Sequence, residues 1–170
     1  GVEPARAEDH PPTIYEDSGM AWADSVPGEA PRAVPAEDVG PDALTSVPAV
    51  EVLNDLLAGV YLSGAQGIVS YDDGGGYGHP DHVLAHQLSR AVATALGLPF
   101  WEIVSAPEDA EAQSEDEVET HDIAPWLDRK RAALRAYATQ LTVDGEEIVH
   151  VGGQRQAIET IEQFRLRTLE

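Results

Sequence analysis

The segment GIVSYDDGGGYGHPDHVLAHQLSRAVATALGLPFWEIV, residues 67–104, decides the fold class of this chain. Residues 67–71 form a short apolar run before an Asp-Asp-Gly turn signal, which predicts a buried strand. A helical stripe of apolar residues follows over 83–96, Gly97 is positioned to end that helix, and residues 99–104 predict a second strand. Because strand, glycine-rich loop, helix and strand make a βαβ unit, we predict an α/β fold with a mainly parallel sheet.

The sequence on either side of this unit is less regular. Residues 1–46 are rich in Pro, Ala, Gly and acidic residues and show no sustained period, so we predict an irregular loop region there. Residues 50–60 have helical spacing, and residues 106–120 form an acidic low-complexity loop. Beyond that loop we predict a helix over 124–141, a strand over 146–151, and a closing helix over 155–170 with Ile158, Ile161 and Phe164 facing inward.

Composition limits the partners and ligands that the chain can have. Its 170 residues fit one domain, and 10 basic against 31 acidic residues give a net charge of -21. We therefore expect no nucleic-acid and no membrane partner. The chain has no cysteine, which excludes disulfides and thiolate metal sites and leaves His, Asp and Glu as the strong ligands. This composition fits a cytoplasmic protein.

Chemistry-bearing side chains gather just after the first predicted strand. In open α/β sheets, ligands bind beyond the carboxyl ends of the strands, and Tyr77, His79, Asp81 and His82 follow such an end. Neutral imidazoles at this spacing are credible zinc ligands. Two histidines on a helix also occur by chance, and a catalytic zinc site needs about three protein ligands. We interpret His86, one turn further on, as a surface residue or a support for the ligands.

Three segments carry a resemblance to a known family. YDDGGGYGHPDH, residues 71–82, resembles the second signature of the LmbE-like, or N-acetylglucosaminyl-phosphatidylinositol de-N-acetylase-like, zinc deacetylases. YEDSGM, residues 15–20, and HVGGQRQAIETIEQF, residues 150–164, are similar to segments of their actinobacterial mycothiol-pathway branch. The resemblance implies a Rossmann-like sandwich that uses Zn²⁺. It also implies hydrolysis of an acetamide on an N-acetylglucosaminyl-inositol type of small molecule, with release of acetate.

The same resemblance implies roles for individual residues of the motif. It makes His82 a zinc ligand and His79 the general acid or oxyanion stabiliser. Asp81 would orient His79, and Tyr77 would help to polarise the substrate carbonyl. These roles agree with general chemistry, because bound zinc lowers the pKa of water and a positioned histidine can protonate a departing amine.

The chain departs from the family at the other half of the site. The family's first signature, His-Pro-Asp-Asp, supplies two more zinc ligands and the general base, but the only other His-Pro here is His10-Pro11. Asp17 and Met20 are the implied substrate-binding residues, although Glu16 stands where this branch often has arginine. We therefore predict that residues 1–170 are the C-terminal portion of one deacetylase-like domain, without its first strand–helix units and inactive alone.

Two alternatives remain open at this point. An amidase acting on mycothiol S-conjugates would use the same His79 and His82, whereas a non-catalytic module would use the glycine loop to bind a sugar or a metal. If a first portion is missing, or is supplied by a second chain, we expect an exposed sheet edge or apolar face near residues 67–71.

Overall fold

The computed structural model describes residues 13–22, 33–104, 118–151, 153 and 155–169. The chain divides into two compact units, which are described separately. The first unit comprises residues 1–118 and 164–170, and the second comprises residues 119–163.

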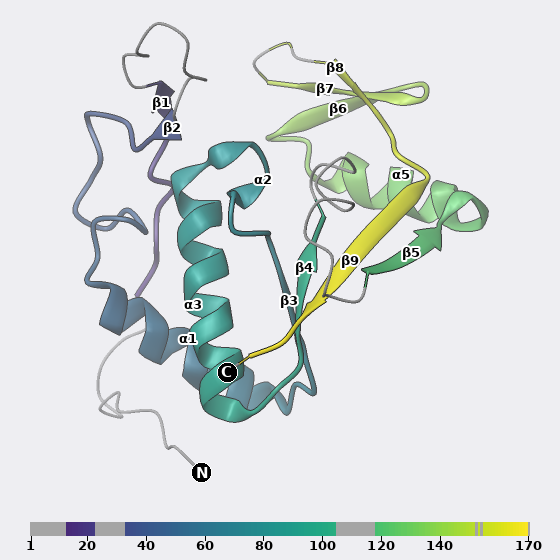
Figure 1. Ribbon diagram of the computed structural model, residues 1–170. Helices are drawn as coiled ribbons and strands as arrows, with labels where there is room; N and C mark the ends of the chain where they lie inside the picture. The colour runs from purple at the N-terminus through teal and green to yellow at the C-terminus, as the bar shows by residue number, and fades with distance from the viewer. Residues whose placement is uncertain (1–12, 23–32, 105–117, 152, 154, 170) are drawn as a thin grey trace, which may run out of the picture. The chain divides into compact units, whose positions relative to one another are not determined.

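The first unit is built around the predicted βαβ segment (Figure 1). β3 and β4 pair in parallel, with Ile68 opposite Phe100, and α3 connects them. Antiparallel β1 and β2 form a separate two-stranded sheet. The elements, in chain order, are β1 (Ala21–Trp22), β2 (Ala33–Val34), α1 (Ala49–Ser63), β3 (Ile68–Ser70), α2 (Gly75–Gly78), α3 (Pro80–Leu96), β4 (Phe100–Ile103) and the last part of β9 (Ile161–Arg167).

The core of this unit lies between the two long helices and the parallel strand pair. Both helices end at a glycine in the left-handed conformation, Gly64 and Gly97, as the sequence predicts. Buried side chains from all four elements form one cluster: Leu57, Ile68, Val92, Ala93 and Phe100. This packing fixes the carboxyl end of β3 beside the first turns of α3, where the motif residues lie.

The mainly parallel sheet is not confirmed, because the sheet is mixed. β9 runs antiparallel to β4, with Arg165 opposite Glu102. The closing helix over 155–170 is therefore wrong, since that range contains β8 (Arg155–Ala157) and β9. Strand pairing overrides the helical spacing of the isoleucines: Arg165 is buried beside the Glu102 carboxylate, and Ile161 is exposed.

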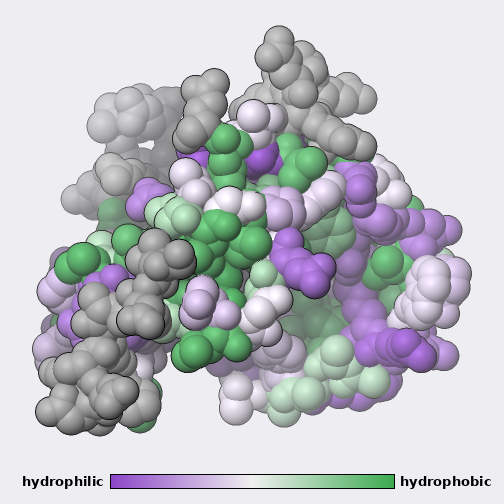
Figure 2. Space-filling view, turned by 90° about the horizontal axis from the view of Figure 1, so that it is seen from below, coloured by the Kyte–Doolittle hydropathy of each residue, from purple (hydrophilic) through white to green (hydrophobic). Residues whose placement is uncertain are grey.

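β3 lies at the end of its sheet in the part of the chain that the structure describes. Its Val69 points away from the buried Ile68 and is 57% exposed. Ile103 of β4 is 42% exposed, and α1 also exposes Leu62. Figure 2 shows hydrophobic residues at the surface of the face it views. The exposed edge and apolar side chains expected near residues 67–71 are thus present.

The second unit contains an antiparallel sheet in the order β6-β7-β8 and a helix that is shorter than predicted. No side chain of α5 is buried, and Lys130 forms an ion pair with Glu162 at 2.9 Å. Of the acidic loop, only the last three residues are described, and they belong to β5. The elements are β5 (Val118–Asp122), η1 (Ala124–Trp126), α5 (Leu127–Ala136), β6 (Leu141–Asp144), β7 (Glu147–His150), β8 and the first part of β9. Among the described helices, none is long and apolar enough to cross a membrane.

Candidate active site

The glycine run after β3 packs directly against the start of α3. A Cβ on Gly75 would lie 2.8 Å from the Val83 backbone nitrogen and 3.0 Å from the His82 Cβ. Gly75 has φ +63°, and Gly76 has φ 73° and ψ -98°, a conformation that L side chains rarely adopt. The glycines are therefore required so that the loop backbone can approach the helix closely and reach the histidines.

We expect Gly75→Ala to lower the free energy of unfolding by about 1–3 kcal/mol, because the new methyl group must displace either the loop or the helix. Chemical denaturation measures the change. Gly59→Ala in α1 is the matched control, since a Cβ there meets nothing within 4 Å and should stabilise the protein by roughly 0.5–1 kcal/mol. Equal effects of the two substitutions would contradict the close approach.

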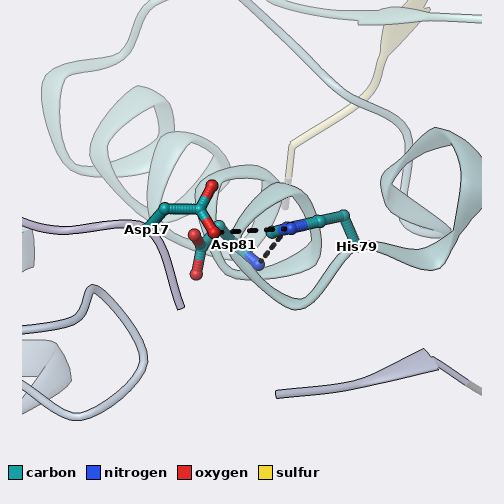
Figure 3. A group of neighbouring side chains, drawn as sticks. All are labelled: Asp17, His79 and Asp81. Atoms are coloured by element: carbon teal, nitrogen blue, oxygen red, sulfur yellow. Dashed lines mark hydrogen bonds and ion pairs between the residues drawn. The ribbon is translucent and has the colours of Figure 1, made fainter. Parts of the chain in front are cut away.

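His79 is the N-cap residue of α3, and its two ring nitrogens have different surroundings. The backbone N–H of Asp81 donates to Nδ1 at 3.2 Å, so Nδ1 is an acceptor and the proton of the neutral ring is on Nε2. This Nε2 lies 4.0 Å from an Asp17 carboxylate oxygen (Figure 3). The ring is buried, and in this tautomer its Nε2–H can donate a hydrogen bond.

His82 has the opposite arrangement. Its Nδ1 donates to the Gly75 carbonyl at 3.2 Å, which leaves the lone pair on Nε2 free to bind a metal ion or accept a proton. Burial lowers the pKa of His82, which favours the neutral ring. The Tyr71 ring stacks on this imidazole with centroids 3.9 Å apart and planes 8° apart.

Tyr77 stands at the exposed side of the two histidines. Its ring makes edge contacts with His79 and His82, at centroid distances of 6.0 and 5.3 Å, while 63% of the residue is exposed. Burial of the phenol and, to a smaller extent, the nearby Tyr71 and Asp17 raise the pKa of Tyr77. Tyr77 therefore keeps its proton and can donate a hydrogen bond to a ligand that enters from solvent.

The two motif segments, which are far apart in the sequence, meet directly. The Ser18 backbone N–H donates to the Asp81 carboxylate at 3.0 Å. Ser18 itself is buried, and its hydroxyl accepts hydrogen bonds from the backbone N–H and the hydroxyl of Thr45 at 3.0 and 2.8 Å. This contact brings Asp17 to His79. Met20 is partly buried, and none of the described hydrogen bonds or ring contacts links it to the histidines.

Asp17, His79 and Asp81 each offer one ligand atom, and these atoms lie within 4.8 Å of one another, so this group could hold a metal ion. The family resemblance instead implies His82 as the ligand. The hydrogen bonds favour His82: a ring that accepts at Nδ1 carries its proton on Nε2, so His79 would have to break its bond to the helix N–H to bind a metal.

Two residues of the site were not assigned from the sequence: Ser18 carries the contact between the motifs, and Tyr71 covers one face of His82. His86, interpreted from the sequence as a surface residue or a support for the ligands, is not at the surface, because it is 5% exposed and hydrogen-bonded to the Tyr71 carbonyl. His86 lies four residues after His82, so its helical spacing was the available signal. Neither Ser18 nor Tyr71 gives a comparable signal, because their contacts depend on tertiary packing.

A cavity of about 710 Å³ lies beside Tyr77 and the first turns of α3. Tyr77 forms part of its wall and also contacts the two histidines. Most of its lining is apolar, and Thr45, Gln87 and the Tyr77 hydroxyl are the polar groups of its side chains: Val34, Pro35, Thr45, Val47, Ala49, Tyr77, Gly78, Pro80, Val83, Leu84 and Gln87. The arrangement can therefore combine hydrogen-bond donation at Tyr77 and His79 with a largely apolar space for part of a ligand.

The chain is similar to several curated proteins named 1D-myo-inositol 2-acetamido-2-deoxy-alpha-D-glucopyranoside deacetylase. The protein of that name from Nocardia farcinica is 37% identical over 167 residues, which is 76% of this chain and 52% of the relative. Those from Kineococcus radiotolerans and Nocardiopsis dassonvillei are 32% and 31% identical, over 91% of this chain and 54% and 64% of the relatives.

The chain thus spans about half to two thirds of the length of these relatives. A scan against family models finds no match. The similarity confirms the resemblance carried by the motif segments, and the chain belongs to the family of these actinobacterial mycothiol-pathway deacetylases.

Proposed function

We propose that this chain forms part of a zinc-dependent hydrolase that removes the acetyl group from an N-acetylglucosamine-containing small molecule of the N-acetylglucosaminyl-inositol type. The names of the relatives support deacetylation of such a compound. We also propose a cytoplasmic location, for which the lack of cysteine is the support.

The observation that carries the proposal is the opposite hydrogen bonding of the two imidazoles: Nδ1 of His79 accepts, whereas Nδ1 of His82 donates. A backbone N–H can only donate and a carbonyl can only accept, so the partners of the two Nδ1 atoms fix different tautomers for His79 and His82. With ring centroids only 4.8 Å apart, one ring offers a hydrogen-bond donor and the other offers a lone pair. Metal-assisted amide hydrolysis uses a donor that stabilises the oxyanion and a metal ligand beside the same bond.

In this reaction, water adds to the acetamide carbonyl, the C–N bond breaks, and acetate and an amine leave. The Nε2–H of His79 would donate a hydrogen bond to the oxygen of the developing oxyanion, and the bond from the Asp81 N–H would hold the ring in position. The proton that water loses to a general base would pass to the departing nitrogen. The Tyr77 hydroxyl would donate to the carbonyl oxygen, and the exposed Asp17 carboxylate would accept hydrogen bonds from sugar hydroxyls. A zinc ion bound at His82 would supply an activated water and stabilise the developing negative charge.

A single histidine ligand does not make a catalytic zinc site, which needs about three protein ligands. We propose that a segment outside this chain, in the same polypeptide or in a partner, supplies the other ligands and the general base. The unpaired edge of β3 within the described residues supports this proposal. We accordingly expect the isolated chain to be inactive.

The apolar cavity beside Tyr77 favours a second candidate, an amidase acting on mycothiol S-conjugates. The largely apolar wall would suit the substituent on sulfur of such a conjugate better than it would suit the hydroxyls of a free inositol.

A paired measurement of bound zinc and amide hydrolysis tests the proposal. In a protein that also carries the missing ligands, we expect near-stoichiometric zinc and release of acetate from an N-acetylglucosaminyl-inositol substrate. The isolated chain should release no acetate. If the protein cleaves a mycothiol S-conjugate with a large apolar group faster than it cleaves the N-acetylglucosaminyl-inositol substrate, the second candidate is correct. A zinc-free full-length protein that hydrolyses neither compound would overturn both candidates.

A further inference from the structure

Tyr71 contacts α3 at two successive turns, through different parts of the residue. Its ring lies flat on His82, and its carbonyl accepts a hydrogen bond from Nδ1 of His86 at 3.0 Å. His82 and His86 are four residues apart and so lie on one face of the helix. Tyr71, at the end of β3, therefore contacts α3 both at His82 and at His86, one turn further on.

The second attachment point is itself held in a buried polar cluster. His86 is 5% exposed and Glu102 of β4 is 1% exposed, and Nδ1 of His86 lies 3.6 Å from a Glu102 carboxylate oxygen. Two acceptors, the Tyr71 carbonyl and this carboxylate, surround the same nitrogen, so the proton of His86 is on Nδ1. Arg167 approaches the Glu102 carboxylate at 3.2 Å. Leaving a buried donor or acceptor without its partner lowers the stability of the protein. These contacts therefore hold the His86 ring in one position.

We propose that His86 is a positioning residue, which fixes the Tyr71 backbone so that the Tyr71 ring holds the His82 imidazole in its metal-binding orientation. Four neighbours then contact this ring: the Gly75 carbonyl accepts from its Nδ1, Tyr71 covers a face, Tyr77 contacts it edge-on, and the His79 ring lies 4.8 Å away. Nε2 is the nitrogen that remains for a ligand. The inference rests on the proposed role of His82; it adds Tyr71 to the site and says through which contacts His86 acts.

The test compares His86→Leu with His86→Asn in the full-length protein that also carries the other zinc ligands, first without zinc and then with Zn²⁺ alone. Leucine removes the donor, whereas the asparagine amide can still donate near the position of Nδ1. The first measurement is the NMR shift of the His82 ring protons, which the stacked Tyr71 ring displaces. The second is the dissociation constant for Zn²⁺. Val92→Ala, in the core on the same helix, is the control for general destabilisation.

We expect His86→Leu to abolish the displacement of the His82 protons and to weaken zinc binding by roughly 10–100-fold, the effect typical of residues that support a metal ligand. His86→Asn should restore both, and Val92→Ala should change neither. An unchanged His82 shift in His86→Leu, or no recovery in His86→Asn, would overturn the inference. If the wild-type protein shows the displaced shift but binds no zinc, the proposed function fails while the positioning of His82 stands.

Discussion

In the full-length protein with His82→Asn, the dissociation constant for Zn²⁺ is expected to rise by on the order of 100-fold, and deacetylation is expected to fall with it. Structural zinc sites with four protein ligands gain about 10–16 kcal/mol in all, so one protein ligand contributes roughly 3 kcal/mol. Asparagine is chosen because its amide can still donate to the Gly75 carbonyl, which Nδ1 of His82 contacts at 3.2 Å. The contact with the Gly75 carbonyl is then kept, while the Nε2 lone pair and the ring that stacks on Tyr71 are lost.

Isothermal titration with Zn²⁺ and an acetate-release assay on the same preparation check this result. Gly59→Ala, at an exposed position of α1, is the control and should bind zinc as the wild type does. Full zinc affinity in His82→Asn would show that the metal is bound elsewhere, with Asp17, His79 and Asp81 as the remaining grouping among the described residues.

The fold could be predicted from the sequence where local signals and packing agree. In the segment around the βαβ unit, glycines mark the helix ends, apolar residues form a helical stripe, and the predicted strands contain branched and aromatic residues. The structure confirms both helix ends and the parallel strand pair. The prediction of a helix at the C-terminus was wrong, because the isoleucines have helical spacing but the segment pairs as a strand with a partner that is far away in the sequence. Burial of Arg165 beside Glu102 of β4 decides that competition, and no local signal reports it.

The candidate site shows the same division. The sequence locates His79, Asp81 and His82 because one glycine loop and one helix start hold them together. It does not reveal that Ser18 bonds to Asp81, or that the stacking of Tyr71 on His82 depends on a strand end lying against a helix. Those contacts form through tertiary packing between separate segments, so the spacing of residues along the chain does not predict them. The family resemblance predicted Asp17 as a residue of the site. The distance of 4.0 Å between its carboxylate and Nε2 of His79 is consistent with that prediction.

In the full-length protein with His79→Asn, the rate of acetate release is expected to fall by about 10²–10³-fold, the usual loss when one donor to an oxyanion is removed, while zinc binding is unchanged. Asparagine is a good N-cap residue, so its side chain can still accept from the Asp81 N–H at the start of α3. The variant therefore removes the Nε2 proton and leaves the helix cap in place. His79→Ala removes both, and its additional loss of stability, typically ~1 kcal/mol, measures the cap.

The two histidine variants separate the two possible metal groupings, because each predicts a different loss. If His82 binds the metal and His79 donates a hydrogen bond to the oxyanion, His82→Asn loses zinc and His79→Asn keeps zinc but loses turnover, with little change in KM. If the metal lies among Asp17, His79 and Asp81, the zinc results are reversed. The opposite hydrogen bonds at the two Nδ1 atoms predict the first pattern, and loss of zinc in His79→Asn would refute that assignment.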